Sequence, residues 1–449
     1  MRLAWFSPLP PHPSGIAAYT HEVVPLLRPH VRLIDVYTDR AAVPTPAVPS
    51  AWPSASVHEF AWRHRRQPYD LIVYQLGNSA AHDFMWAHIF RHPGLLVLHD
   101  AQVHQARALW LLRRLEPRLN DYLAELAASH PDAPADLGRL FAAGLGGSLY
   151  RLWPMVGLVL AASRLTAVHN SHLASALSRA HPDADVTSIE MGVADPLEGQ
   201  ASVDDAARAL RARYRIPAEA CVIGAYGGVT PEKRIPQLLE AVAALGGLAA
   251  PPHVLLVGQR AGHYDVDADI ARLGLGTRAH VIGYVPDAEL PACLAAADVC
   301  WCLRWPSYGE TSAAWLRCLG AGRPTLITAL AHLRDVPMLV VGKDGRLEGP
   351  GDDAVGVAVD PLDETRDLPR ALAALAAEPS LRHQLGQHAR RYWSARHTLP
   401  HMAAAYRQLI ADAATRPSPA PALPAHLLND GTATARRLLA EMGLPEQPW

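Results

Sequence analysis

The stretch CLRWPSYGETSAAWLRCLGAGRP, from Cys302 to Pro324, decides the fold class of this chain. Its apolar start predicts a buried strand, which runs into a turn with one carboxylate, Glu310, and then into a helix. α/β proteins place their ligands at such polar turns after a buried strand. Thr311 and Ser312 would present backbone N–H groups at the start of the helix, where a phosphate binds well. The stretch therefore predicts an α/β fold with a site for a nucleotide diphosphate.

Length and charge narrow the class of protein. A chain of 449 residues exceeds what one hydrophobic core usually supports, so we expect two domains with a cleft between them. With 41 basic and 43 acidic residues and no long basic run, the chain lacks the charge pattern of a nucleic-acid-binding protein. The segment from Met1 to Ser7 does not resemble a secretory signal. We therefore expect a cytoplasmic protein, with the inner face of the membrane as the alternative location.

The cysteines predict core thiols and no metal site. Cys300 and Cys302 alternate within a predicted buried strand, and no further Cys or His ligand follows at a suitable spacing. Reduced thiols are typical of an intracellular protein. The chain also carries no Asp-x-Asp pair at a suitable strand end, which agrees with a reaction that needs no metal.

Short apolar runs alternate with helical stretches along both halves of the chain. In the first half these runs are residues 2–7, 31–37, 71–75, 95–99 and 165–169, and in the second half 222–226, 254–257, 279–282, 299–303, 325–328 and 355–359. Strands that alternate with helices favour right-handed crossovers and a parallel sheet. Each half is therefore expected to form a Rossmann-like domain, and the stretch from Gln105 to about Ala162 is expected to form several helices.

The domain boundary is placed near Asp195 to Asp204. This gives an N-terminal domain at residues 1–200, a C-terminal domain at 201–400 and a final region at 401–449. The final region is expected to hold a return helix, the Pro/Ala-rich linker RPSPAPALP and a helix from Ala433 to Met442. Trp110 and Leu111 stand beside Arg113 and Arg114, a basic amphipathic mix that fits an interfacial helix. Peripheral membrane contact thus stays open beside the simpler interpretation, a helix that covers its own sheet.

Over roughly residues 1 to 410 the chain resembles the family-4 retaining glycosyltransferases of the GT-B fold. The resemblance rests on the order and spacing of seven segments: residues 11–27 (PHPSGIAAYTHEVVPLL), 98–100 (LHD), 191–193 (MGV), 226–241 (YGGVTPEKRIPQLLEA), 255–258 (LLVG), 283–290 (GYVPDAEL) and the opening stretch. It implies two Rossmann-like domains facing across a cleft, with the acceptor on the first and a nucleotide-sugar donor on the second. It implies no cofactor beyond that donor.

The resemblance assigns roles to several residues of the donor side. Lys233 would neutralise the leaving diphosphate, and Glu310 would accept hydrogen bonds from donor-sugar hydroxyls. Gly15, after Ser14, would let the backbone approach the diphosphate, although a tight turn that feeds a helix explains the same residues. Thr311 and Ser312 would extend the diphosphate site. The segment that follows the strand at 279–282, Tyr284 and Val285, would face the nucleobase, with ordinary packing as the alternative.

Two positions depart from the family pattern. Gly228 stands where the family carries an arginine, and Arg304 or Arg234 would have to replace that charge. The second carboxylate of the family's Glu-x7-Glu motif, expected to bind the ribose, falls on Cys318 by counting or on Arg317 by aligning the GRP that follows. Arg317 would instead help to offset the diphosphate charge.

On the acceptor side, His99 and Asp100 follow a buried strand. The family often places such a histidine near the donor sugar and acceptor, where polar positioning rather than proton transfer is its expected role. A structural hydrogen bond is the alternative. Weaker candidates on this side are Asn78, His82, His104 and His169.

These observations lead to one hypothesis with two alternatives. The chain is expected to be a retaining, metal-independent glycosyltransferase that moves a sugar from a nucleotide-diphosphate sugar to a hydroxyl of a saccharide, lipid-linked or small-molecule acceptor, as in polysaccharide or glycolipid biosynthesis. One alternative is a nucleotide-sugar epimerase or sugar-phosphate synthase on the same fold. The other is a noncatalytic homologue that binds a nucleotide sugar, since one carboxylate and one arginine of the pattern are missing.

Overall fold

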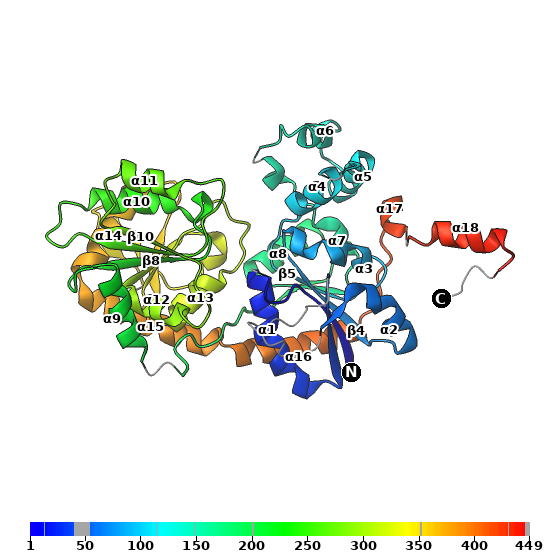
Figure 1. Cartoon of the computed structure of the whole chain (residues 1–449), viewed down its shortest axis with the longest axis horizontal. Helices are drawn as coiled ribbons and strands as arrows, with labels where there is room; N and C mark the ends of the chain where they lie inside the picture. Colours follow the sequence, from blue (N-terminus) through cyan, green and yellow to red (C-terminus); the bar gives the residue numbers. More distant parts are fainter. Residues whose placement is uncertain are drawn as a thin grey trace. The chain divides into compact units, whose positions relative to one another are not determined.

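The computed structural model describes residues 1–12, 14–39, 54–113, 115–147, 149–199, 202–350, 353–429 and 431–444. Contacts divide the chain into two compact units (Figure 1). The first unit is Met1–Ile189 together with Ala403–Trp449, and the second is Glu190–Met402. Each unit is built around its own parallel sheet.

Seven strands of the described residues form the sheet of the first unit, in the order β3-β2-β1-β4-β5-β6-β7. They are β1 (Arg2–Phe6), β2 (Leu33–Thr38), β3 (Ser54–Ser56), β4 (Leu71–Leu76), β5 (Leu95–Leu98), β6 (Leu165–Val168) and β7 (Val186–Ser188), and every neighbouring pair is parallel. β4, β5 and β6 are buried along their whole length, as a sheet covered on both faces requires. The sequence predicted all of these strands except β3 and β7.

Helices connect these strands. α1 (Gly15–Leu27) begins where it does because the Ser14 hydroxyl accepts a hydrogen bond from the backbone of Ile16. It is followed by α2 (Phe60–Arg66), the turn η3 (Ala80–Met85), α3 (Trp86–Ile89) and, after β6, α8 (Ser171–Ala180).

A helical lobe is inserted between β5 and β6. It holds α4 (His104–Leu112), α5 (Leu119–Ser129), α6 (Leu137–Ala142), η4 (Leu149–Leu152) and α7 (Gly157–Ala161), and α4, α5 and α6 gather together in Figure 1. This confirms the series of helices predicted from Gln105 to Ala162. A buried ion pair between Arg107 of α4 and Glu125 of α5 joins two of them, with Nε to Oε2 at 2.9 Å.

Six described strands form the sheet of the second unit, all parallel, in the order β10-β9-β8-β11-β12-β15. They are β8 (Val222–Tyr226), β9 (His253–Val257), β10 (Ala279–Gly283), β11 (Val299–Cys302), β12 (Thr325–Thr328) and β15 (Gly356–Val359). A small antiparallel pair, β13 (Val340–Val341) and β14 (Leu347–Glu348), lies outside this sheet. The apolar runs of the sequence thus predicted the whole main sheet of this unit.

Two hydrophobic cores lie on the two faces of this sheet. One packs alternate strand residues against α10 (Ile235–Ala244), α11 (Val266–Arg272) and α14 (Glu364–Ala377). The other packs the remaining strand residues against α9 (Val203–Arg213), α12 (Leu290–Ala296) and α13 (Ala313–Gly320). Figure 1 shows α10 and α11 on one side and α9 and α12 on the other. The helix α15 (Pro379–Arg396) follows α14.

Both sheets reverse their strand order at one point. In the first unit the reversal lies between β1 and β4, and in the second between β8 and β11. Ligands of open α/β sheets bind outside the carboxyl ends of the strands at such a switch point. The segments that follow β1, β4, β8 and β11 are therefore the places to look for a site.

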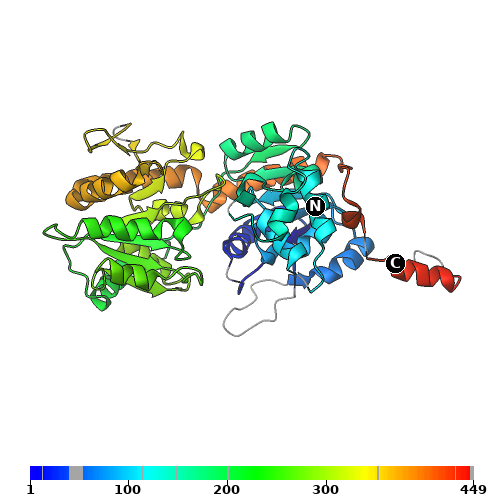
Figure 2. The same ribbon diagram turned by 90° about the horizontal axis from the view of Figure 1, so that it is seen from above.

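The C-terminal segment returns to the first unit. α16 (Leu399–Thr415) enters it at Ala403, and Tyr406 packs on Trp5 of β1 with ring centroids 5.6 Å apart. Figure 2 shows α16 in orange beside elements of this unit. Two short helices follow, α17 (Ala425–Leu428) and α18 (Ala433–Glu441). Among the described residues, no helix has the length and apolar character to cross a membrane.

Candidate functional site

Lys233 lies over the carboxyl end of β8, on one side of the switch point. It ends the short turn η5 (Pro231–Lys233), and its Nζ donates to the carbonyl oxygen of Tyr226 at 2.5 Å. The ammonium fills the space beside Gly227, where a Cβ would lie only 2.2 Å from Nζ. Burial, and then the charge of Arg304, lower the pKa of Lys233 to about 8. A cation with unused donors is thus held at this edge of the sheet.

Glu310 lies on the other side of the switch point, in the loop after β11. Its side chain is only 9% exposed. One oxygen accepts from Arg304 Nη1 at 2.5 Å, and the other accepts from the Ser307 hydroxyl at 2.9 Å and from the Tyr308 backbone at 2.8 Å. These donors fix the carboxylate in one orientation, and its remaining lone pairs can still accept hydrogen bonds from hydroxyl groups.

Hydrogen bonds join the two loops that carry Lys233 and Glu310. The Trp301 indole donates to the carbonyl oxygen of Lys233 at 2.9 Å, and the Trp305 backbone donates to that of Glu232 at 2.8 Å. Arg304 interacts with both residues, because it forms an ion pair with Glu310 and its charge lowers the pKa of Lys233. The structure therefore brings Lys233, Arg304 and Glu310 together at the switch point.

The helix after this loop starts slightly later than expected. Ser312 is the N-cap of α13, because its hydroxyl accepts from the backbone of Trp315 at 3.3 Å, and the helix itself begins at Ala313. The backbone amides at the helix start are therefore those after Ser312, and Thr311 precedes the cap. Both residues still lie next to Glu310 in the chain.

Cys318 lies beside Lys233. It is fully buried, its Sγ lies 3.9 Å from that of Cys302, and both thiols act on the pKa of Lys233, which they raise slightly against the larger effects of burial and Arg304. Counting eight residues forward from Glu310 thus gives a buried thiol whose electrostatic effect reaches this lysine. Arg317, on the same helix, is half-buried.

The region of the missing arginine has room for a side chain. A Cβ at Gly228 would meet only the Thr230 methyl group, at 3.5 Å, and one more distant oxygen. Of the two proposed replacements, Arg304 lies at the edge of the sheet beside Glu310. Arg234 points elsewhere, because its guanidinium pairs with Glu364 at the start of α14.

Tyr284 and Val285 follow β10, the outermost strand of the sheet. Tyr284 is 71% exposed, and Val285 is half-buried against the core under α12. Two strands separate β10 from β11 in the sheet order. The pair therefore lies at the same carboxyl edge as Lys233 and Glu310, but farther along it.

In the first unit, the segments after β1, β4 and β5 meet around Gly77. A Cβ at Gly77 would lie 2.5 Å from the Ile16 side chain and 3.2 Å from an Asp100 carboxylate oxygen. Gly15 is exposed at the first residue of α1, and among the described residues no atom beyond its chain neighbours and its own helix backbone lies within 4 Å of the Cβ position. Packing alone therefore does not require a glycine at position 15, which agrees with a backbone that a ligand approaches.

His99 is half-buried and is held by a chain of hydrogen bonds that leads into the core. Its Nε2 lies 2.8 Å from the Gln75 amide oxygen, the Gln75 amide nitrogen donates to the Tyr406 hydroxyl, and that hydroxyl lies 2.8 Å from the Tyr19 hydroxyl. Because an amide oxygen only accepts, Nε2 carries the proton and Nδ1 is an acceptor. Burial, and then the charges of His169 and His82, lower the pKa of His99 well below its usual range. It is therefore a neutral polar group and a weak base.

The other candidates of the first unit divide into two groups. Asp100 accepts from the Asn78 backbone at 3.0 Å, and the Asn78 side chain bonds to Gln102 and to the backbone of Ala106, so this asparagine fixes the start of α4. His82 and His169 lie near His99. His104 instead bonds to Trp153 and Tyr122 inside the helical lobe, which makes its role structural.

Gln75 and Tyr406 are supporting residues that the sequence did not reveal. They orient His99 from β4 and from α16, and 331 residues separate them in the chain. The only sequence signal was a polar glutamine within the apolar run of β4, which is fully buried.

Comparisons with known proteins identify the family that the chain resembles. Residues 207–311 match the family model of the glycosyl transferases group 1. A 2-deoxystreptamine glucosyltransferase from Streptomyces kanamyceticus is 31% identical over 143 residues, which are 31% of this chain and 36% of that protein. The match thus spans about a third of the relative's length. It confirms the predicted resemblance at the level of group 1.

Solved structures share the fold. Sucrose-phosphate synthase from Thermosynechococcus elongatus superposes with a TM-score of 0.61 at 17% identity, covering 92% of this chain and 99% of that one. WaaG, a glycosyltransferase involved in lipopolysaccharide biosynthesis, gives 0.57 at 15% identity over 91% and 99%. Anabaena HepE in complex with UDP-glucose gives 0.56 at 15% identity over 92% and 99%. The predicted GT-B class, α/β with two Rossmann-like units, is confirmed.

Proposed function

We propose, from the match of residues 207–311 to the glycosyl transferases group 1, that this protein is a retaining, metal-independent glycosyltransferase that uses a nucleotide-diphosphate sugar. One observation carries the proposal: Lys233, Arg304 and Glu310 lie together at the β8/β11 switch point, which is where such a sheet binds a ligand. The HepE neighbour, in complex with UDP-glucose, makes that donor the first to test.

In this proposal the second unit binds the donor. The Lys233 ammonium faces the diphosphate, and the negative charge that develops on the leaving phosphate strengthens this interaction in the transition state. Arg304 adds a second positive charge and Glu310 orients the sugar through its hydroxyl groups. Two protein cations at the edge give the diphosphate counter-charges without a metal ion.

The reaction then proceeds on one face of the sugar. The acceptor hydroxyl forms a bond to the anomeric carbon as the bond to the diphosphate oxygen breaks, through an oxocarbenium-like state. The leaving phosphate oxygen takes the acceptor proton. No protein nucleophile is required, and the configuration of the anomeric carbon is retained.

The first unit binds the acceptor in this proposal. His99 is neutral and its Nδ1 accepts, so it positions a hydroxyl group and does not act as a strong base. Asp100 follows it in the chain as a second acceptor, and Ile16, at the start of α1, lies beside the same glycine as Asp100, Gly77. The acceptor of the Streptomyces kanamyceticus relative, 2-deoxystreptamine, is a small polyhydroxylated amine and serves as the first acceptor to test.

Transfer and product configuration test the proposal together. The protein is incubated with UDP-glucose and 2-deoxystreptamine, then with other nucleotide sugars and saccharide acceptors, and the new linkage is assigned by proton NMR. An α-linked product from an α-linked donor is expected, and it should disappear in Glu310→Ala but persist in Glu219→Ala, an exposed glutamate of the same unit. A β-linked product would contradict retention.

The two alternatives predict different results in the same assay. An epimerase or sugar-phosphate synthase would alter the nucleotide sugar without a hydroxyl acceptor or would transfer only to a sugar phosphate. A noncatalytic homologue, which the thiol of Cys318 in place of a carboxylate favours, would bind a donor and release no nucleotide with any acceptor.

A further inference from the structure

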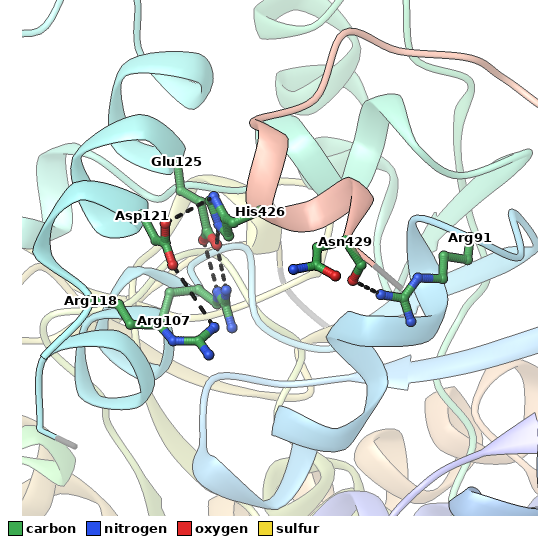
Figure 3. A network of polar contacts seen from close by, with 7 residues as sticks. All are labelled: Arg91, Arg107, Arg118, Asp121, Glu125, His426 and Asn429. Atoms are coloured by element: carbon green, nitrogen blue, oxygen red, sulfur yellow. Dashed lines mark hydrogen bonds and ion pairs between the residues drawn. The ribbon is translucent and has the colours of Figure 1, made fainter. Parts of the chain in front are cut away.

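The C-terminal segment after α16 docks on the helical lobe of the first unit. In Figure 3, His426 of α17 lies between two carboxylates of α5, with Nε2 2.8 Å from Glu125 and Nδ1 3.6 Å from Asp121. A second contact fixes the end of this segment, because Arg91 donates to the carbonyl oxygen of Asn429. The Pro/Ala-rich linker is thus followed by residues that bind the body of the protein.

This docking completes the wall of a half-open cavity of about 280 Å³ lined by η3, α3, α4 and α17. This volume lies just below the range of about 300 to 1,000 Å³ that is typical of sites for drug-sized ligands, so the cavity has room only for a smaller molecule. Three positive side chains, two indoles and one carboxylate contribute to its wall: Arg91, Arg107, Arg118, Trp86, Trp110 and Asp83.

Arg107 is the residue that points to a ligand. Its side chain is 3% exposed, Nε and Nη2 bond to Glu125, and the guanidinium lies over the Trp86 ring at 4.0 Å. Within the part of the chain that the structure describes, no acceptor lies within hydrogen-bond distance of its buried Nη1. An unsatisfied buried donor is costly, so an oxygen from another molecule would stabilise this arrangement.

We propose that this cavity is a second ligand site, for a sugar phosphate. Guanidinium groups line the cavity from two sides, Arg107 and Arg118 on one and Arg91 on the other (Figure 3), and such groups bind phosphate oxygens through paired N–H donors. The Asp83 carboxylate would repel a second anionic group but accepts hydrogen bonds from hydroxyls. Trp86 and Trp110 offer flat apolar faces to the C–H groups of a sugar ring. Charge, hydroxyl acceptors and aromatic faces are thus combined in one cavity.

The charges around the cavity explain why a phosphate suits it better than a neutral sugar. Arg91 and Arg118 lie at its exposed rim, and Arg118 is only loosely paired, 3.9 Å from Asp121. Arg107 is paired with Glu125 on one side only. A dianionic group at the rim can therefore bind Arg91 and Arg118 beside the buried Arg107 without breaking the Arg107–Glu125 pair.

The test is isothermal titration of the full-length protein with glucose 6-phosphate, glucose and inorganic phosphate at matched ionic strength. Lys233→Ala serves as the background, so that binding at the proposed donor site does not contribute. Arg91→Ala and Arg118→Ala alter the exposed rim, and Arg113→Ala, at the exposed end of α4 and outside the cavity wall, is the matched control.

We expect glucose 6-phosphate to bind in the Lys233→Ala background. Adding Arg118→Ala or Arg91→Ala should weaken this binding by about tenfold or more, which is the effect of losing one charge-assisted hydrogen bond. Arg113→Ala should leave it unchanged. Binding that is absent, or equal in the rim and control variants, would overturn the site. Equal affinity for inorganic phosphate or for glucose would overturn the sugar-phosphate assignment. Because Lys233 is already replaced, none of these outcomes depends on the proposed transferase activity.

Discussion

Raising the pH above about 8 should weaken binding of a nucleotide diphosphate, because Lys233 then loses its charge. Burial, and then the charge of Arg304, lower the pKa of this lysine from its usual 10.5 to about 8. At about 1.4 kcal/mol per pKa unit, the charged form is disfavoured there by roughly 3 kcal/mol. A bound diphosphate favours the charged form and raises the pKa again, so the complex keeps its proton to higher pH than the free protein. Affinity is therefore complete below pH 8 and falls by about tenfold per pH unit above it.

The assay is calorimetric titration with UDP between pH 7.5 and 9.5, in pairs of buffers with different ionisation enthalpies to count the proton taken up. Lys233→Arg is the matched control, because an arginine stays charged over this range and corrects for ionisation of the nucleotide itself. The wild-type protein should take up nearly one proton at pH 9, and the variant none. Equal pH profiles for the two proteins would refute the role given to Lys233.

Three further results are expected. Gly227→Ala should lower UDP affinity and cost about 1–2 kcal/mol of stability by chemical denaturation, because φ is +89° and the new Cβ would displace the Lys233 ammonium. The control Gly262→Ala, with open space around it, should change neither quantity. An unchanged affinity in Gly227→Ala would contradict this packing. Gly228→Arg should fold normally, because the position has room for a side chain. In titrations it should tighten UDP binding about two- to fivefold, because an exposed ion pair adds up to about 1 kcal/mol. Weaker binding would argue against a diphosphate there. Acidification from pH 6.5 towards 4 should lower the free energy of unfolding by about 1.4 kcal/mol per pH unit for each buried histidine, because the unfolded chain takes up the proton first. His88 is an example, since burial lowers its pKa to about 3. A free energy of unfolding from urea melts that stays constant over this range would show that these histidines are protonated in the fold.

The sequence predicted most of both sheets because their strands are buried on two faces and therefore read as continuous apolar runs. β8 and β12 were predicted to the residue. The missed strands β3, with sequence SAS, and β7, with sequence VTS, are edge strands of three residues without an apolar run. Their pairing depends on neighbours that are distant in the chain, and no local pattern indicates it.

The site was predictable where it depends on strand ends and unpredictable where it depends on distant contacts. Lys233 and Glu310 each follow an apolar run, so a parallel sheet places them at one edge. The support of His99 by Tyr406, and the docking of His426 on α5, join positions more than 300 residues apart. Neither carries a spacing that a single sequence could show.

The location of the donor site can be measured directly by thermal unfolding with UDP-, GDP-, ADP- and dTDP-glucose, using the wild-type protein, Glu310→Ala and Lys233→Ala. A ligand that binds the folded state only raises the melting temperature in proportion to its concentration and affinity. We expect one donor to raise the melting temperature of the wild-type protein, with the shift lost in both variants, which would place the nucleotide sugar at the β8/β11 edge. A shift that both variants retain would contradict this account.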